Sequence, residues 1–358
     1  MGLFSKLITA ITRAPQRLGS DSIAQSGPAD SVSTDPIALN RYVQKLHELG
    51  QYSRSLPIAT DATERTERTF GSNSREFAHS LNNLATTYAR LGQYHAAERF
   101  YCRALAVQRS LLGPDHVDVA GTLSNLAMVY NDVGDYEQAE SFLKKALHID
   151  EKQLGPNHES VANDLNNLAT AYHSQGRLDE AERLYARALA INEQIYGPDS
   201  HRLADMLNNL GVTHLAKRDL ASAERCCMRA LMNREKSLGP DHPDVAISAL
   251  NVGRCYKESG QYELAERAYK RAMGIWEQSL GPGHPSLASA LNNLAVIYAS
   301  NHRYNDAESC LLRALDILSK NFGQRHPQFL MCLESLVNLY ENNHCHESLA
   351  LLKKRLSV

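Results

Sequence analysis

The sequence predicts an all-α solenoid, which is a linear stack of antiparallel helix pairs. A motif beginning Leu81-Asn82-Asn83-Leu84-Ala85 returns every 42 residues without insertion. A glycine closes each unit, and a glutamate recurs in the second half of each regular unit. A fixed period of this size indicates repeated units that each pack against their neighbours. We place the unit starts at Leu39, Leu81, Leu123, Leu165, Leu207, Ala249, Leu291 and Leu333.

The first half of each unit has the pattern of an amphipathic helix. Leu81, Leu84, Ala85 and Tyr88 follow the i, i+3, i+4, i+7 spacing that forms one apolar stripe. Gly92 marks the helix end, because glycine adopts the left-handed conformation of a helix exit without a steric penalty. Two units lack this glycine and carry Arg218 and His302 instead.

The second half predicts another helix, from about Tyr94 to Leu112. Ala97 and Ala104 lie on its apolar face, and their small size lets two helix backbones approach closely. Units are joined by a loop such as Gly239-Pro240-Asp241-His242-Pro243, where the prolines end one helix and begin the next. We expect the recurring loop histidines to hydrogen-bond at the start of the following helix rather than to bind metal. They are His116, His158, His242, His284 and His326.

The order of Leu, Ala or Gly, Tyr, Gly, Tyr, Ala, Tyr and Ala resembles a tetratricopeptide repeat. The 42-residue length, "LNNLA" and "LGPDHPDVA" are similar to the kinesin-light-chain variety of that repeat, over residues 39–358. The resemblance implies a right-handed superhelix and a non-enzymatic role in binding proteins. A kinesin light chain itself is not expected, because the 38 residues before the array are too few for its long coiled coil.

Composition excludes several function classes. The formal net charge of −2 provides no basic face for nucleic acid. Seven cysteines without a CxxC pair favour a reducing, cytoplasmic location. No apolar run reaches the ~18 residues of a membrane span. Phosphate-binding, dinucleotide, HExxH and GxSxG motifs are absent from the sequence, so we expect no enzyme activity, cofactor or metal.

The chain divides into three parts. Residues 1–18 form a basic amphipathic segment, for which we consider a tail that caps the first repeat, a membrane or partner anchor, and an organelle presequence. Residues 19–38 are small and polar, which predicts a flexible linker. Residues 39–358 form the array, and we expect its last helix to cap the stack with Lys353, Lys354 and Arg355.

An asparagine on the polar face of each first helix suggests a binding groove. The series is Asn83, Asn125, Asn167, Asn209, Asn251 and Asn293. Asparagine is a mediocre residue inside a helix, so its recurrence on one face calls for a reason. Its amide donates and accepts hydrogen bonds, which suits the backbone of an extended peptide. In the resembling family, asparagines at this place contact peptide backbone. The alternative is that they bond between neighbouring helices and hold the stack in register.

Selectivity is then expected from the residues on the same face that vary between units. The charged residues that we assign to the groove are Arg90, Asp132, Arg254, Lys257 and Glu258, and Arg41 and Asp205 are charged nearby. Because both signs occur, a purely acidic ligand is not predicted. Trp276 has mostly polar counterparts in the other units. We weigh an exposed partner patch against a tryptophan covered by the following loop, and favour the covered one.

The sequence thus predicts an interaction scaffold that binds an extended peptide or a partner helix in its concave groove. The alternative is an assembly factor at a membrane or organelle, addressed by residues 1–18. The partner's identity and the oligomeric state do not follow from the sequence.

Overall fold

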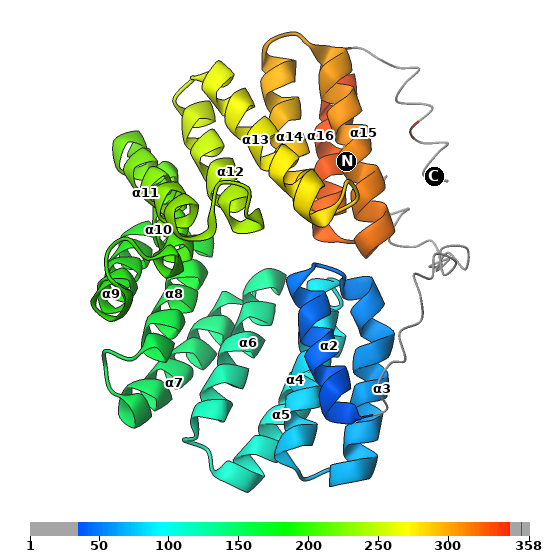
Figure 1. Cartoon of the computed structure of the whole chain (residues 1–358), viewed down its shortest axis with the longest axis vertical. Coiled ribbons are helices and arrows are strands. Elements are labelled where there is room, and N and C mark those ends of the chain that lie inside the picture. Colours follow the sequence, from blue (N-terminus) through cyan, green and yellow to red (C-terminus); the bar gives the residue numbers. More distant parts are fainter. Residues whose placement is uncertain (1–34, 344–351, 353–358) are drawn as a thin grey trace.

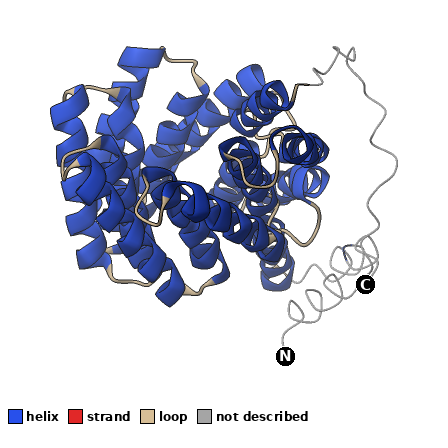
Figure 2. Cartoon of the chain, turned by 90° about the horizontal axis from the view of Figure 1, so that it is seen from below, coloured by secondary structure: helices blue, strands red, loops and turns tan. Residues whose placement is uncertain are grey.

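The computed structural model describes residues 35–343 and residue 352, and its described part is a right-handed superhelical array of helix pairs (Figure 1). The even-numbered helices lie on the inner side of the turn and the odd-numbered helices on the outer side. Figure 2 shows only helices and short connections in this part. The inner helices are α2 (Pro36–Glu48), α4 (Arg75–Arg90), α6 (Val117–Val133), α8 (Glu159–Ser174), α10 (Ala204–Ala216, preceded by the short η1, His201–Leu203), α12 (Pro243–Glu258), α14 (Ser286–Ser300) and α16 (Pro327–Asn342). The outer helices are α3 (Tyr52–Phe70), α5 (Tyr94–Leu112), α7 (Tyr136–Leu154), α9 (Leu178–Tyr196), α11 (Leu220–Leu238), α13 (Tyr262–Leu280) and α15 (Tyr304–Phe322).

The loop histidines cap the inner helices, as predicted. In each case Nδ1 of the ring accepts a hydrogen bond from the backbone N–H two residues later, which satisfies one donor that the helix itself leaves unpaired. For His116 and Asp118 the distance is 3.1 Å, and for His326 and Gln328 it is 3.3 Å. His158, His242 and His284 make the same contact.

Each helix pair turns at a residue with positive φ. Glycine occupies this place in most units, but Arg218 and His302 adopt φ values of 64° and 57°. A side chain in this region carries strain, so we expect Arg218→Gly to stabilise the fold by about 0.5–1 kcal/mol, after the entropy cost of glycine in the unfolded chain. Thermal denaturation of that variant, with Arg218→Lys as the control, measures the effect. An unchanged or lower melting temperature would contradict it.

The core consists of the stripes that the repeat pattern predicts. Ala97, Ala104 and Leu81 are fully buried, and the small alanines bring paired helices close. Trp276 is also buried, with 2% of its surface exposed, and its indole N–H donates to the Pro243 carbonyl oxygen at 3.1 Å. The suggestion of an exposed tryptophan patch is therefore wrong. The covered tryptophan that we favoured is confirmed in its burial.

Polar side chains also run through the interior between successive units, and we call this series the buried polar ladder. Each bond joins an inner helix to the next inner helix. The pairs are Asn40 with Ser80, Asn82 with Thr122, Ser124 with Asp164, and Asn208 with Ser248, at 2.7, 2.8, 2.6 and 3.2 Å. Outer-helix residues join it, such as Arg234, whose guanidinium donates to Ser248 at 2.9 Å. Because buried polar groups are costly without partners, the ladder favours one register of stacking.

Further polar bonds link neighbouring units on the outer side. The recurring glutamate accepts from a tyrosine of the next unit, as with Glu98 and Tyr130 at 2.6 Å. The recurring arginine pairs with a glutamate of the preceding unit, as with Arg103 and Glu67 at 2.6 Å. These contacts join neighbouring repeats on the outer side of the array.

The two ends of the array meet, as the right side of Figure 1 shows. Nε2 of His284, in the α13–α14 loop, lies 3.0 Å from the carbonyl oxygen of Leu49 at the end of α2. The rings of Tyr52 and Phe322 stack with centroids 6.3 Å apart. One superhelical turn therefore closes into a ring.

The first helix, α2, begins at Pro36, three residues before the expected start of the array. The expectations for residues 1–18, for most of the linker and for the basic end at Lys353 to Arg355 fall outside the described residues. No helix among those described has both the length and the apolar character to cross a bilayer.

Candidate binding groove

The inner helices α4 to α14 each carry the recurring asparagine, so the six amides lie along the inner side of the array. Three of them bond within the protein. Asn83 is buried and donates to Asn40 at 2.9 Å, and Asn209 donates to Asn166 at 3.0 Å. Asn293 donates to its own helix at the Ser289 carbonyl oxygen and accepts from Lys257 at 3.2 Å. In these units the amide helps to hold helices together.

The other three amides are unused by the protein. Asn125 is exposed, and Asn167 and Asn251 are partly exposed. Within the described part of the chain, their side chains make no hydrogen bond. In each of these three units, the amide N–H and the amide oxygen are therefore available to a ligand. We call the inner surface formed by the inner helices the inner wall.

The variable residues on this face include charged side chains at two places along the array. Near its N-terminal end, Arg90 and Asp132 are both exposed. Although Asp132 is exposed by its surface area, neighbouring atoms displace part of the water around its carboxyl and raise its pKa, and the positive charge of Arg90 partly offsets that rise. Further along, Nζ of Lys257 lies 3.5 Å from Oε1 of Glu258, and it also contacts Asn293. Burial lowers the pKa of His173 in α8, and the positive charge of Arg254, in the same helix as Lys257, lowers it further.

Apolar side chains are exposed in the C-terminal half of the same wall. Ile247 and Met331 stand at the repeat position of His79, and Val296 stands at the position of Thr86. Met128 and Val212, at the Thr86 position of other units, are only partly exposed. The groove is therefore polar and charged at one end and partly apolar at the other.

A polar pocket of about 320 Å³ lies in the groove between α4 and α6. Asn83 and Asn125 line it, together with Gly121. Gly121 stands at the repeat position of His79, where every other unit has a residue with a side chain. The Arg75–Asp118 ion pair, at 3.0 Å, closes one side. Two acceptor oxygens, Asn82 Oδ1 and Gln108 Oε1, are buried there without a partner in the described residues. The pocket thus favours a group that carries N–H donors.

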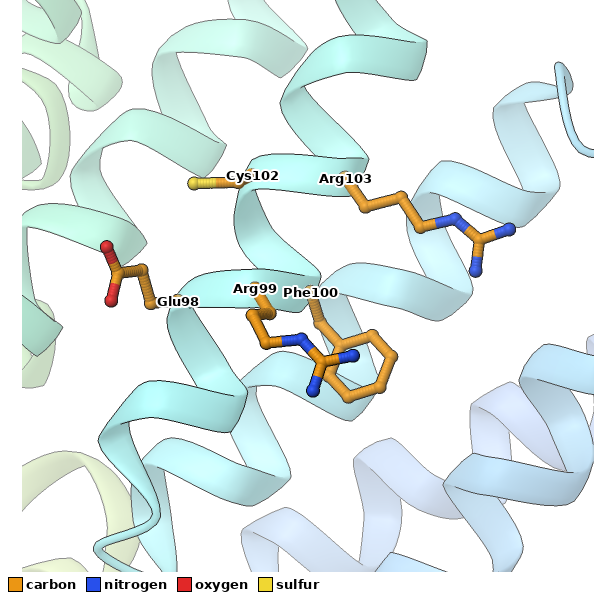
Figure 3. Close-up of a pocket in the computed structure, with 5 residues that line it drawn as sticks. All are labelled: Glu98, Arg99, Phe100, Cys102 and Arg103. Atoms are coloured by element: carbon orange, nitrogen blue, oxygen red, sulfur yellow. The ribbon is translucent and has the colours of Figure 1, made fainter.

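A second hollow, of about 470 Å³, lies against the outer helix α5 (Figure 3). Its described lining comes from one stretch of that helix, residues 98–103. Glu98 and Arg103 point to opposite sides of α5 in Figure 3, and each is engaged with a neighbouring unit. The side chains do not converge on a common point, so the hollow lacks the geometry of a catalytic site.

The residues described here bring no group of three or more histidine, cysteine or carboxylate side chains close enough to share a metal ion. The most perturbed carboxyl is Asp164. Burial raises its pKa to about 7, and Asp150, which faces it, raises the pKa further against a hydrogen bond from Ser124. The pair is enclosed, with 6% of Asp150 and 4% of Asp164 exposed, which does not suit a catalytic role.

Sequence reasoning missed this pair, the pocket and the contact between the ends. The pair had a signal, because both positions are polar in several units, and a series of polar residues at a buried register predicts a ladder. Gly121 was a signal for the pocket. The end-to-end contact had none, because His284 and His326 look like the other capping histidines.

Comparison with known proteins agrees with this architecture. Models of the tetratricopeptide repeat match residues 77–118, 118–194, 165–231, 202–278, 250–320 and 286–358. No curated protein sequence matches the chain.

Several solved structures are similar. BtubC (BKLC) from P. vanneervenii is 27% identical, with a TM-score of 0.50 over 68% of this chain and 93% of that one. A putative kinesin light chain of P. anserina with nearly identical TPR-like repeats is 23% identical, with a TM-score of 0.46 over 57% of this chain and 97% of that one. The APC/C hetero-tetramer Cut9-Hcn1 is 16% identical, with a TM-score of 0.53 over 94% of this chain and 52% of that one. Because the family models together cover most of the array, the chain belongs to the tetratricopeptide repeat family.

Proposed function

We propose that this protein is a non-enzymatic scaffold that binds an extended peptide or a partner helix along its inner groove. The observation that carries the proposal is the set of three open amides, Asn125, Asn167 and Asn251, on a wall whose other three asparagines are bonded within the protein. Each open amide offers a donor and an acceptor to a passing backbone, which holds a segment without regard to its side chains.

The inner wall has polar, apolar and charged parts, so we expect the bound segment to carry polar, apolar and charged side chains. The pocket between α4 and α6 suits a donor such as a carboxamide or an amine, and the exposed Ile247, Val296 and Met331 suit apolar side chains further along. Lys257 and Glu258 supply both charges.

The proposal predicts that changing Asn125, Asn167 and Asn251 together to Ala weakens peptide binding without loss of stability. Each lost hydrogen bond contributes about 1 kcal/mol net, so the three together reduce affinity about 100-fold. Peptides are first selected on the full chain from a displayed random library, and their Kd values are then measured by fluorescence anisotropy.

Asn83→Ala is the control, because its amide is buried and bonded to Asn40. We expect this variant to lower the melting temperature, whereas the triple variant leaves it unchanged. If the triple variant instead lost stability and kept its affinity, the amides would serve only the stack. A library without binders would remove the groove proposal altogether.

A further inference from the structure

The two ends of the array touch at two equivalent contacts, one unit apart, which we call the seam. The α2–α3 turn meets the α13–α14 loop, and one unit later the α4–α5 turn meets the α15–α16 loop. In the first contact His284 reaches the Leu49 carbonyl oxygen. In the second, His326 hydrogen-bonds the Arg90 backbone. Ser53 also donates to the Asn321 carbonyl oxygen, and Phe322 stacks on His326 with ring centroids 4.3 Å apart.

The turn glycines at the seam are unlike the others. A Cβ atom added to Gly50 would lie 2.6 Å from Nε2 of His284, and one added to Gly92 would lie 3.2 Å from the His326 ring. At Gly176 and Gly260, in equivalent turns, nothing lies within 4 Å. All four glycines have φ between 65° and 76°. The close approach therefore belongs to the seam and not to the turn conformation.

The two seam histidines use both ring nitrogens. Nδ1 accepts the capping hydrogen bond of the next helix, so the neutral ring carries its proton on Nε2 and donates across the seam. A second proton on Nδ1 would abolish the capping bond and place a positive ring in the contact. Burial and the backbone hydrogen bond across the seam are the two influences on the pKa of each ring, and no carboxylate of the described residues is among them. The charged groups nearest to the seam in the sequence are Glu48, Arg90 and Arg325.

The groove inside the ring stays open to solvent. Arg90, Asn125, Ile247 and Val296, spread around the inner wall, are all exposed, so side chains do not fill the centre. With the seam shut, this wall surrounds whatever lies in the groove.

We propose that the array encircles the segment it binds, and that the seam is a latch that opens to admit it. This rests on the proposed function of the groove, but the latch itself is testable without a partner. The partner that fits is a single extended stretch of chain. A closed ring can surround such a stretch, whereas a folded domain could bind only from outside the ring.

Acid opens the latch. Burial holds the pKa values of His284 and His326 below the ordinary 6.5, although their hydrogen bonds to Leu49 and Arg90 partly oppose this. The closed state thus binds fewer protons than the open state. Closure is favoured at neutral pH and is lost as pH falls below about 6.5.

Small-angle X-ray scattering of the full chain at pH 7.5 tests the latch. We expect Gly50→Ala/Gly92→Ala to increase the radius of gyration, because the added methyl groups push the seam apart. Gly176→Ala/Gly260→Ala is the matched control, with the same backbone strain and open space around it. It should keep the radius of the unchanged protein.

A second pair of variants separates the latch from helix capping. Asparagine still caps a helix but is too short to reach across the seam. His284→Asn/His326→Asn should therefore open the ring, and His158→Asn/His242→Asn should not. The unchanged protein should expand between pH 7.5 and 5.

Three results would overturn the proposal. The unchanged protein could already scatter as an open superhelix at pH 7.5, or the seam and control variants could change equally. Light scattering could also show a dimer that dissociates in the seam variants, which would assign these surfaces to a second copy. Loss of peptide binding in the asparagine variants concerns the groove alone, so the two proposals fail separately.

Discussion

Asp164→Asn is expected to raise the melting temperature at pH 8 and to leave it nearly unchanged at pH 4. Asp164 is buried opposite Asp150, and each carboxyl has a buried oxygen without a partner in the described residues. An asparagine there would still accept from Ser124 and would donate its N–H to Asp150. The variant therefore replaces a buried acid by a neutral group of the same shape.

The pH dependence follows from the raised pKa. Burial raises the pKa of Asp164 from 3.8 to about 7 in the folded protein. Between these values the folded protein keeps a proton that the unfolded chain releases, so stability is full below about pH 4 and falls as pH rises to 7. At 1.36 kcal/mol per pH unit, the loss by pH 8 is at most about 4 kcal/mol. The asparagine variant has no such proton to lose.

Thermal denaturation from pH 4 to 8 measures this difference, with the exposed Asp241→Asn as the control. A parallel pair of curves for the unchanged protein and Asp164→Asn would show that the carboxyl pair holds no proton at neutral pH. Asp150→Asn should give the same convergence at low pH, because the pair titrates as one unit.

Gly253→Ala is expected to destabilise the fold by about 1–3 kcal/mol, the usual cost of forcing extra volume into a packed core. A Cβ atom at Gly253 would lie 2.7 Å from the ring of Tyr269, which is fully buried and has no room to retreat. Chemical denaturation measures the loss as a lower midpoint.

Gly121→Ala is the matched control, since it is also a glycine inside an inner helix but has nothing within 4 Å of its Cβ position. Here alanine should stabilise by up to about 1 kcal/mol, because glycine is a poor helix residue. The two variants should thus change stability in opposite directions. If both were neutral, Tyr269 would have space that the packing does not show.

The sequence by itself determined the units, their helices and their caps. The 42-residue period places every turn glycine and loop histidine, and these local features suffice because each one acts within its own helix end. The pairing between repeats was also predictable, since equivalent glutamates and arginines recur at one register.

Burial across units was decided only by the tertiary structure. The sequence favoured a covered Trp276, but the contacts of this register came from the structure: Arg234 bonds to Ser248 of the next inner helix, whereas Trp276 bonds to Pro243 of the preceding one. The six asparagines divide into bonded and open ones for a similar reason, because the neighbouring helix supplies a partner such as Asn40 or Asn166 in some units only.

Closure of the ring was likewise a tertiary outcome. Whether the α2–α3 turn meets the α13–α14 loop depends on the small rotation between neighbouring units, added over the intervening units. No local pattern records that sum. The contact between Leu49 and His284 exists because the accumulated turn brings them together, and the inner wall becomes an enclosing one for the same reason.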